Sequence, residues 1–168
     1  MPTTTTTAKN HQVRWKEIAR DPVLQDLPYK VETNAQGQII VSPHQNSHSF
    51  LQASVRDLLQ EQLSEGVVVP EFAIATEQGV KVPDVIWTSS ERREEMEATG
   101  DPTTLAPELC VEVMSDTNTE EEMQQKRSLY LQAGAEEVWT VDREGHVRFF
   151  GATERKRSSL APDYPRQV

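Results

Sequence analysis

The sequence predicts a single α/β domain, an α+β arrangement in which helices flank one central mixed β-sheet. Its 168 residues suit one domain with a proper hydrophobic core. Segments with helical and strand-like patterns follow the order helix, hairpin, helix, several strands, helix, hairpin, which is typical of such a domain. No internal repeat or linker divides the chain. We therefore expect one domain over residues 11–168, preceded by a disordered tail over the Thr-rich residues 1–10.

Local patterns place the elements of the first third of the chain. Residues 11–20 predict a short helix that ends at Asp21-Pro22, because the residue before a proline disfavours helical geometry. Residues 29–42 alternate on both sides of a Gly-containing turn and predict a β-hairpin. Residues 47–63 predict the first long helix, since their apolar residues recur at three- and four-residue spacings.

The rest of the chain is rich in strand-like runs. Residues 109–114 form the most apolar run, which indicates a central strand of the sheet. Thr119 and Glu122 match a capping box for a helix that ends at Gly134. The charged residues 89–99 fit either a surface helix or an ordered loop. The predicted strands of this part are 67–70, 72–76, 81–87, 109–114, 137–142 and 146–150, followed by an edge strand or a loose tail.

Composition limits the classes of function. The net charge of −10 argues against a broad basic surface for nucleic acid, although a local basic channel or metal ions in an acidic cleft remain compatible with it. No apolar run approaches the roughly 18 residues of a membrane-spanning helix, and no signal peptide is recognisable, so we expect a cytoplasmic protein without membrane contact. The single cysteine, Cys110, lies in an apolar run and is expected to be a buried, inert thiol.

Two of the apolar runs are each interrupted by one carboxylate, Asp84 and Glu112. Because burying a lone charge costs several kcal/mol or more, these residues indicate a site built at strand ends. Converging carboxylates bind Mg²⁺ or Mn²⁺, and the backbone carbonyl of Val113 would add a ligand. Lys126, on the following helix, would orient or deprotonate the attacking water, or stabilise charge in the transition state. Together these residues suit metal-dependent phosphodiester hydrolysis.

Each of these residues also has an ordinary structural interpretation. Pro83-Asp84 is common in turns at the start of a strand, and Glu112 could be salt-bridged inside the sheet. Lys126 and Glu122 are four residues apart, the spacing of a surface pair on a helix. The metal site is therefore inferred from the combination of the three residues rather than from any one of them.

Two further residues are candidates for accessory roles. Glu32, on the first hairpin strand, is expected to point toward the cleft as an additional acidic residue. His48, in the first turn of the long helix, is either solvated or in contact with the substrate or with water held by a metal ion. Tyr130 is interpreted as helix packing and Trp139 as core. The cluster Arg155-Lys156-Arg157 is a weak candidate for phosphate contact and more typical of a solvated tail.

Three blocks of the sequence resemble the Uma2 family (DUF820). They are Val-Pro-Asp-Val at 82–85, Glu-Leu-Cys-Val-Glu-Val-Met-Ser at 108–115, and the run from Lys126 to Asp142. The resemblance covers roughly residues 28–150 and includes the hairpin in the N-terminal half. Uma2 proteins are restriction-endonuclease-like and similar in fold to the PD-(D/E)xK nucleases. The resemblance therefore implies a restriction-endonuclease-like core with a central mixed sheet.

The resemblance also implies roles for individual residues. Asp84 matches the aspartate of the PD motif, and Glu112 matches the acidic residue of (D/E)xK. Met114 stands where that motif has its lysine, which suggests that the lysine has migrated to Lys126. DNA is then the expected substrate. A homodimer is expected too, formed through the exposed sheet edge or the aromatic C-terminal hairpin.

Two other functions stay open at this point. One is a catalytically inactive interaction protein that retains the nuclease fold, which the net charge and Met114 favour. The other is a metal-dependent hydrolase of smaller phosphate esters.

Overall fold

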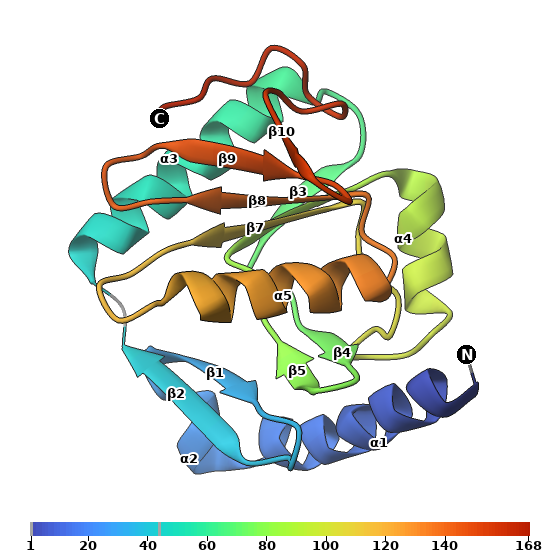
Figure 1. Cartoon of the computed structure of the whole chain (residues 1–168). Coiled ribbons are helices and arrows are strands. Elements are labelled where there is room, and N and C mark those ends of the chain that lie inside the picture. The colour runs from blue at the N-terminus through green and yellow to red at the C-terminus, as the bar shows by residue number, and fades with distance from the viewer. Residues whose placement is uncertain (1, 44) are drawn as a thin grey trace.

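A six-stranded mixed sheet forms the centre of the fold (Figure 1), with the strand order β10-β9-β8-β7-β6-β3. Strands β7 and β8 run parallel, and the other neighbours run antiparallel. This computed structural model describes the backbone of residues 2–43 and 45–168, and the side chains of residues 7–43 and 45–168. The six strands are β3 (Val67–Pro70), β6 (Val85–Thr88), β7 (Leu109–Val113), β8 (Glu137–Val141), β9 (Val147–Phe150) and β10 (Glu154–Arg155).

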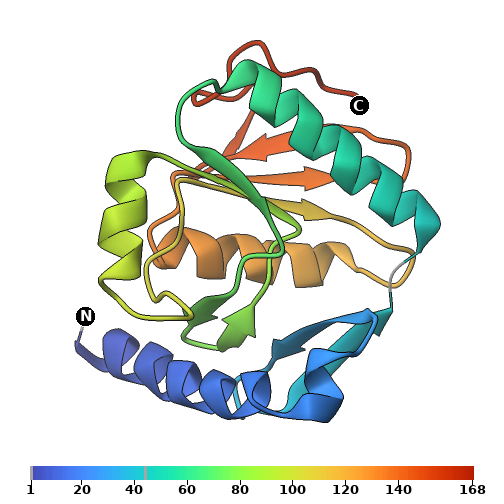
Figure 2. The same ribbon diagram turned by 180° about the vertical axis from the view of Figure 1, so that it is seen from behind.

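Helices α3 (Asn46–Gln62) and α5 (Glu120–Gln132) cover opposite faces of this sheet, as the two views in Figures 1 and 2 show. Helix α5 is the crossover that two parallel strands require, since it connects β7 to β8. The side chains of β7 alternate between the two faces. Its apolar residues at positions 109, 111 and 113 pack with α3, whereas Cys110 packs with Tyr130 of α5. Glu112 therefore faces α5.

A second layer lies below the sheet in Figure 1. It contains helices α1 (Pro2–Ala19) and α2 (Pro22–Gln25), the hairpin of β1 (Tyr29–Thr33) and β2 (Ile39–Pro43), and the hairpin of β4 (Ile74–Thr76) and β5 (Gly79–Lys81). The Thr33 hydroxyl accepts a hydrogen bond from the Val80 N–H at 2.8 Å, which joins the two hairpins. The Gln12 side chain donates to the Thr99 carbonyl at 2.9 Å and so ties α1 to the loop after α4 (Ser90–Glu97).

Close backbone approach explains Gly79 at the start of β5. Its φ of +102° is in the left-handed region, which favours glycine, and a Cβ atom there would collide with the Thr33 carbonyl. The approach holds the β4–β5 hairpin against the end of β1. It matters for function because β1 also carries Lys30 and Glu32.

The boundaries of three elements differ from the sequence prediction. Helix α1 begins at Pro2, so residues 2–10, expected as a disordered tail, are helical, whereas Met1 lies outside the described residues. Burial of Ala8 contributes to the longer helix, because tertiary packing overrides weak helix propensity. The single strand expected at 81–87 is divided, and Asp84 lies in the bend between β5 and β6. Pro83 explains the division, since it has no N–H for a sheet ladder. The strand expected at 72–76 is confined to β4.

Several predicted features are confirmed. Strand β7 is central, and the Thr119 side chain accepts the Glu122 N–H as the cap of α5. The charged segment that begins at Ser89 forms α4, and β10 is an edge strand. None of the helices in the described part of the chain is long and apolar enough to cross a membrane.

The aromatic residues of the β8–β9 hairpin lie in the core. Trp139 packs edge-on against Phe149, with ring centroids 5.0 Å apart, and against Tyr164 at 4.6 Å. Trp139, Phe149 and Phe150 are all buried. The suggestion that these aromatic residues form a dimer interface is therefore wrong, because they are buried in the core of the same chain.

Candidate active site

A cleft of about 460 Å³ lies between the β1–β2 hairpin, the end of β7 and helix α5. It collects acidic and basic side chains from segments that are far apart in sequence. The charged and titratable residues among its walls are Lys30, Glu32, His48, Lys81, Asp84, Glu112, Glu122 and Lys126.

Glu112 enters this cleft from the central strand. Because its side chain faces α5, it meets two residues of that helix: the Tyr130 hydroxyl donates to its carboxylate at 2.5 Å, and the Lys126 ammonium lies 3.3 Å away. Lys30 contacts its second oxygen at 3.3 Å. Burial raises the pKa of the Glu112 carboxyl, while Lys126 and Lys30 work in the opposite direction.

Asp84 lies beside Glu112 because of the strand register. The antiparallel pairing of Val85 with Val111 extends by one position to place Asp84 opposite Glu112. The Asp84 carboxylate accepts the Val113 N–H at 2.7 Å and contacts Lys30 at 3.2 Å. Burial by itself raises the pKa of Asp84, but Lys30, His48 and the Val113 N–H together hold it well below its ordinary value.

His48 approaches Asp84 from the start of α3. Its Nε2 atom is 3.4 Å from Asp84 Oδ2, and the side chain is buried. The hydrogen bond to Asp84 raises the pKa of His48, and burial opposes that rise. The backbone of Val113 also raises the His48 pKa through a hydrogen bond. The ordinary interpretation of His48 as a solvated first-turn residue is therefore wrong.

Glu32 and Lys126 form the other side of the cluster. The Lys126 ammonium lies 3.0 and 3.1 Å from the two oxygens of Glu32, which also accepts the Val82 N–H at 2.7 Å. Burial opposes ionisation of both groups, yet Lys126 and Lys30 leave the pKa of Glu32 lowered. Glu112 and Glu32 likewise leave the pKa of Lys126 raised. Glu32 points into the cleft, as expected. Lys126 pairs with Glu32 and Glu112 inside the cleft, so the alternative interpretation of Lys126 as the partner of Glu122 on the helix surface is wrong.

The structure thus brings the predicted residues together, and it adds two that the sequence analysis missed. Lys30 bridges the carboxylates of Asp84 and Glu112. Side chains alternate along a strand, so Lys30 and Glu32 share one face of β1, and this spacing was the available signal. Tyr130 is fully buried and bonds to Glu112, whereas it was expected only to pack. Its position four residues after Lys126 was the corresponding signal.

The donor set fits a hard divalent cation. Carboxylate oxygens are the ligands that Mg²⁺ and Mn²⁺ prefer, and Asp84 and Glu112 supply them. The Lys30 ammonium already contacts oxygens of Asp84 and Glu112 at once, so a single cation can contact both carboxylates. Val113 lies beside these carboxylates, because its N–H donates a hydrogen bond to Asp84.

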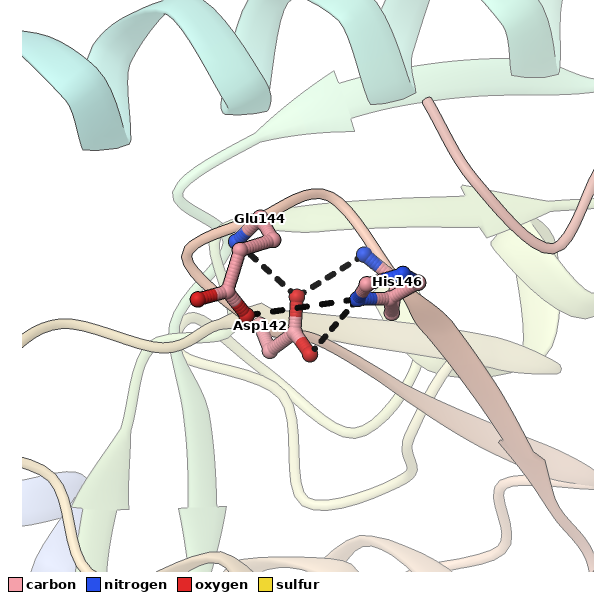
Figure 3. Close-up of side chains that lie close together, drawn as sticks. All are labelled: Asp142, Glu144 and His146. Carbon is pink, nitrogen blue, oxygen red and sulfur yellow. Dashed lines mark hydrogen bonds and ion pairs between the residues drawn. The ribbon is translucent and has the colours of Figure 1, made fainter.

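A second group of possible metal ligands lies at the turn between β8 and β9. Ligand atoms of Asp142, Glu144 and His146 are within 4.8 Å of one another. Figure 3 shows Asp142 between the other two: its Oδ1 accepts the N–H groups of Glu144 at 3.0 Å and His146 at 2.8 Å, and its Oδ2 contacts the His146 ring at 3.2 Å. Such bonds are those of a side chain that closes a tight turn, which accounts for the group without an ion.

Comparison with known proteins agrees with the architecture. A family model described as "Putative restriction endonuclease" matches residues 16–160. Among solved structures, the chain is similar to one titled as a putative nuclease belonging to DUF820 from Anabaena variabilis ATCC 29413. The two share 16% sequence identity and a TM-score of 0.59, over 80% of this chain and 73% of the other. That likeness concerns the fold. No curated protein matches this chain.

Proposed function

The chain belongs to the Uma2 family, and from this membership we propose that it hydrolyses phosphodiester bonds of DNA with a divalent metal ion as cofactor. The observation that carries the proposal is the convergence of Asp84, Glu112 and Lys126 in one cleft. Buried carboxylates beside a buried lysine are costly to assemble, and groups of this kind cluster at active sites.

Asp84, Glu112 and the backbone carbonyl of Val113 would hold the ion, Mg²⁺ or Mn²⁺. When bound, the ion would supply charge neutralisation at the scissile phosphate and would favour ionisation of water near it. The chain itself supplies positioning. The Tyr130 hydroxyl fixes the carboxylate of Glu112, while His48 and the Val113 N–H fix that of Asp84.

Lys126 is the proposed catalytic cation. Its ammonium group is held by Glu32 on one side and Glu112 on the other, so it enters the reaction already oriented. From this position it would orient the attacking water or stabilise negative charge that develops on the phosphate. Glu32 acts as a positioning residue, because it fixes the lysine rather than the substrate.

The walls of the cleft are compatible with a nucleic-acid strand. Ile40, Val41 and Pro43 form an apolar wall on β2, and Lys81 adds a cation near the cluster. The cleft is lined by four carboxylates and three lysines, and the whole chain has a net charge of −10. Attraction for phosphate in the cleft would therefore depend on a divalent ion that neutralises the carboxylates. We accordingly expect binding of DNA to depend on the cleft rather than on a broad surface.

A homodimer is part of the same proposal, because cutting both strands of a duplex requires two sites. Strand β2 pairs with β1 in the described part of the structure, and it carries Ile39, a partly exposed apolar residue that does not line the cleft. An edge strand of this kind is suited to pairing with a second copy. Light scattering on the parent chain and on Ile39→Lys measures whether a dimer forms through this edge.

One observation favours the alternative, a nuclease-shaped interaction protein without activity. Lys30 and Lys126 already pair with the carboxylates, so the cluster is satisfied without a metal ion. A metal-dependent nuclease must bind Mn²⁺, whereas the interaction protein need not bind it, so Mn²⁺ binding distinguishes the two functions.

The test is Mn²⁺ binding by calorimetry, followed by cleavage of plasmid and single-stranded DNA. We expect the parent chain to bind Mn²⁺ and to cut DNA, and we expect Asp84→Ala and Glu112→Ala each to abolish both properties. Lys126→Met should retain binding and lose cleavage. Glu144→Ala, which removes an equal charge from the β8–β9 turn, is the matched control.

Absence of Mn²⁺ binding by the parent chain, even with DNA present to supply phosphate oxygens, would overturn the metal-dependent mechanism. Mn²⁺ binding that is lost only in Glu144→Ala would show that the ion binds at Asp142, Glu144 and His146, and it would contradict the proposed site. Hydrolysis of nucleotides without cleavage of DNA would select the smaller phosphate esters as substrates.

A further inference from the structure

Lys30 occupies the space between the two proposed metal ligands. Its Nζ atom lies 3.2 Å from Asp84 Oδ1 and 3.3 Å from Glu112 Oε2. The side chains of the three residues are 9%, 1% and 3% exposed, so water screens these contacts weakly. The ammonium group therefore neutralises both carboxylates from a single position.

This lysine comes from a different layer than the carboxylates do. Glu112 belongs to β7 and Asp84 directly precedes β6 in the central sheet, whereas Lys30 belongs to the two-stranded β1–β2 hairpin. It reaches them over 54 and 82 residues of sequence. A lysine side chain carries its charge on a flexible four-carbon stem, so the ammonium can move without displacing the strand that bears it.

Lys126 differs from Lys30 in what it contacts. Lys126 is held by both oxygens of Glu32 and by Glu112 Oε1. Lys30 instead contacts Asp84 Oδ1 and the other oxygen of Glu112, Oε2. The two lysines thus hold separate positions, and that of Lys30 is the one where a cation joins the two proposed ligands.

We propose that Lys30 is a tethered cation that competes with the divalent ion for Asp84 and Glu112. The inference rests on the proposed metal site and extends it, because it assigns a residue that sets how tightly that site binds metal. Without the ion, Lys30 keeps the two carboxylates together against their repulsion. When the ion binds, the Lys30 ammonium leaves the space between them. Lys30 is accordingly a positioning residue.

The first experiment compares Mn²⁺ affinity in the parent chain, Lys30→Met and Lys81→Met by calorimetry. Methionine keeps the length of the lysine side chain and removes its charge. We expect Lys30→Met to bind Mn²⁺ at least about tenfold more tightly than the parent, because the competitor is gone. Lys81 lines the same cleft but donates to the Thr33 carbonyl at 2.8 Å. Lys81→Met therefore reports the effect of net charge alone, which we expect to be less than about threefold.

A second experiment uses the unmodified chain, so it does not depend on how the variants fold. Reductive methylation labels lysine amines that are free of ion pairs and open to solvent, and mass spectrometry counts the label at each lysine. Lys30 should be protected without metal and become labelled in saturating Mn²⁺. Labelling at Lys156, an exposed residue, should be the same under both conditions.

The outcomes distinguish this inference from the proposed function. Tighter Mn²⁺ binding by Lys30→Met supports the inference. If the parent chain does not bind Mn²⁺ and Lys30→Met does, the tethered cation stands and the metal-dependent mechanism falls. If the parent binds Mn²⁺ and Lys30→Met binds no more tightly than Lys81→Met, the inference is overturned while the proposed function stands. Lys30 that stays protected in saturating Mn²⁺ overturns it as well.

Discussion

Replacing Lys126 by methionine tests the charge cluster most directly. The substitution keeps the stem of the side chain and removes the ammonium group that lies 3.0 Å from Glu32 and 3.3 Å from Glu112. Those carboxylates are 8% and 3% exposed, so they lose a partner in a place where water does not replace it. The expected result is a less stable protein rather than one with unchanged stability.

The magnitude follows from the burial of the pair. Removing one partner of a buried ion pair costs about 3–5 kcal/mol. Lys126 is itself 16% exposed, which favours the lower end, about 3 kcal/mol. For a domain of this size each kcal/mol lowers the Tm by about 2–4 °C, so the Tm should fall by about 6–12 °C.

The loss should also depend on pH. The pKa of Glu32 is lowered in the folded chain, so its stabilising contribution is present above its ordinary value of 4.5 and is lost as the pH falls below it. The pKa of Lys126 is raised, so its contribution is present below 10.5 and is lost as the pH rises above it. The difference between parent and variant should therefore be greatest near neutral pH and shrink below about pH 4.

Urea denaturation of the parent, Lys126→Met and Lys156→Met, followed by circular dichroism at pH 7 and pH 3, measures these differences. Lys156 is exposed, so its substitution changes the same charge at little cost. Adding Glu32→Gln to Lys126→Met should restore part of the stability, because it removes the carboxylate left without its partner. A loss below about 1 kcal/mol at pH 7, or an equal loss at both pH values, would refute the argument.

Three more substitutions or probes test neighbouring parts of the fold. Tyr130→Phe removes the hydrogen bond to Glu112 and should cost about 1.5–3 kcal/mol in urea denaturation; a cost near zero would contradict that bond. Gly79→Ala should lower the Tm by the equivalent of more than about 1 kcal/mol, because its φ is +102° and the added Cβ meets the Thr33 carbonyl. Burial raises the pKa of the Cys110 thiol well above its ordinary value, so it should react with a thiol reagent only after unfolding; rapid reaction of the folded chain would contradict this.

The candidate site was partly accessible from sequence because charge inside an apolar run is chemically anomalous. Asp84 and Glu112 interrupt such runs, and the structure places both in one cleft with Lys126. Their catalytic and metal-binding roles, and the role of Val113 as a ligand, stay predictions. Lys126 and Tyr130 are four residues apart and therefore share a helix face, and both reach Glu112.

Position within an element was harder to predict than its type. The sequence suggested that Asp84 lies inside a strand, whereas Pro83 divides that strand and leaves Asp84 in a bend before β6. Helix α1 begins before the predicted start at residue 11, and Ala8 in this additional part is buried. Both outcomes depend on how a segment packs, which the local pattern does not contain.

Local patterns in the sequence were sufficient to predict most elements of the fold and to single out Asp84 and Glu112. Periodicity and capping act between residues a few positions apart, and the cost of burying a charge is a property of the residue itself. Which lysines contact these two carboxylates depends on how the layers pack. Lys30 lies 54 residues from Asp84 and 82 from Glu112 in the chain, and it reaches them only because the β1–β2 hairpin packs across the end of the central sheet. Contacts of that range follow from the packing of layers, and no local pattern specifies them.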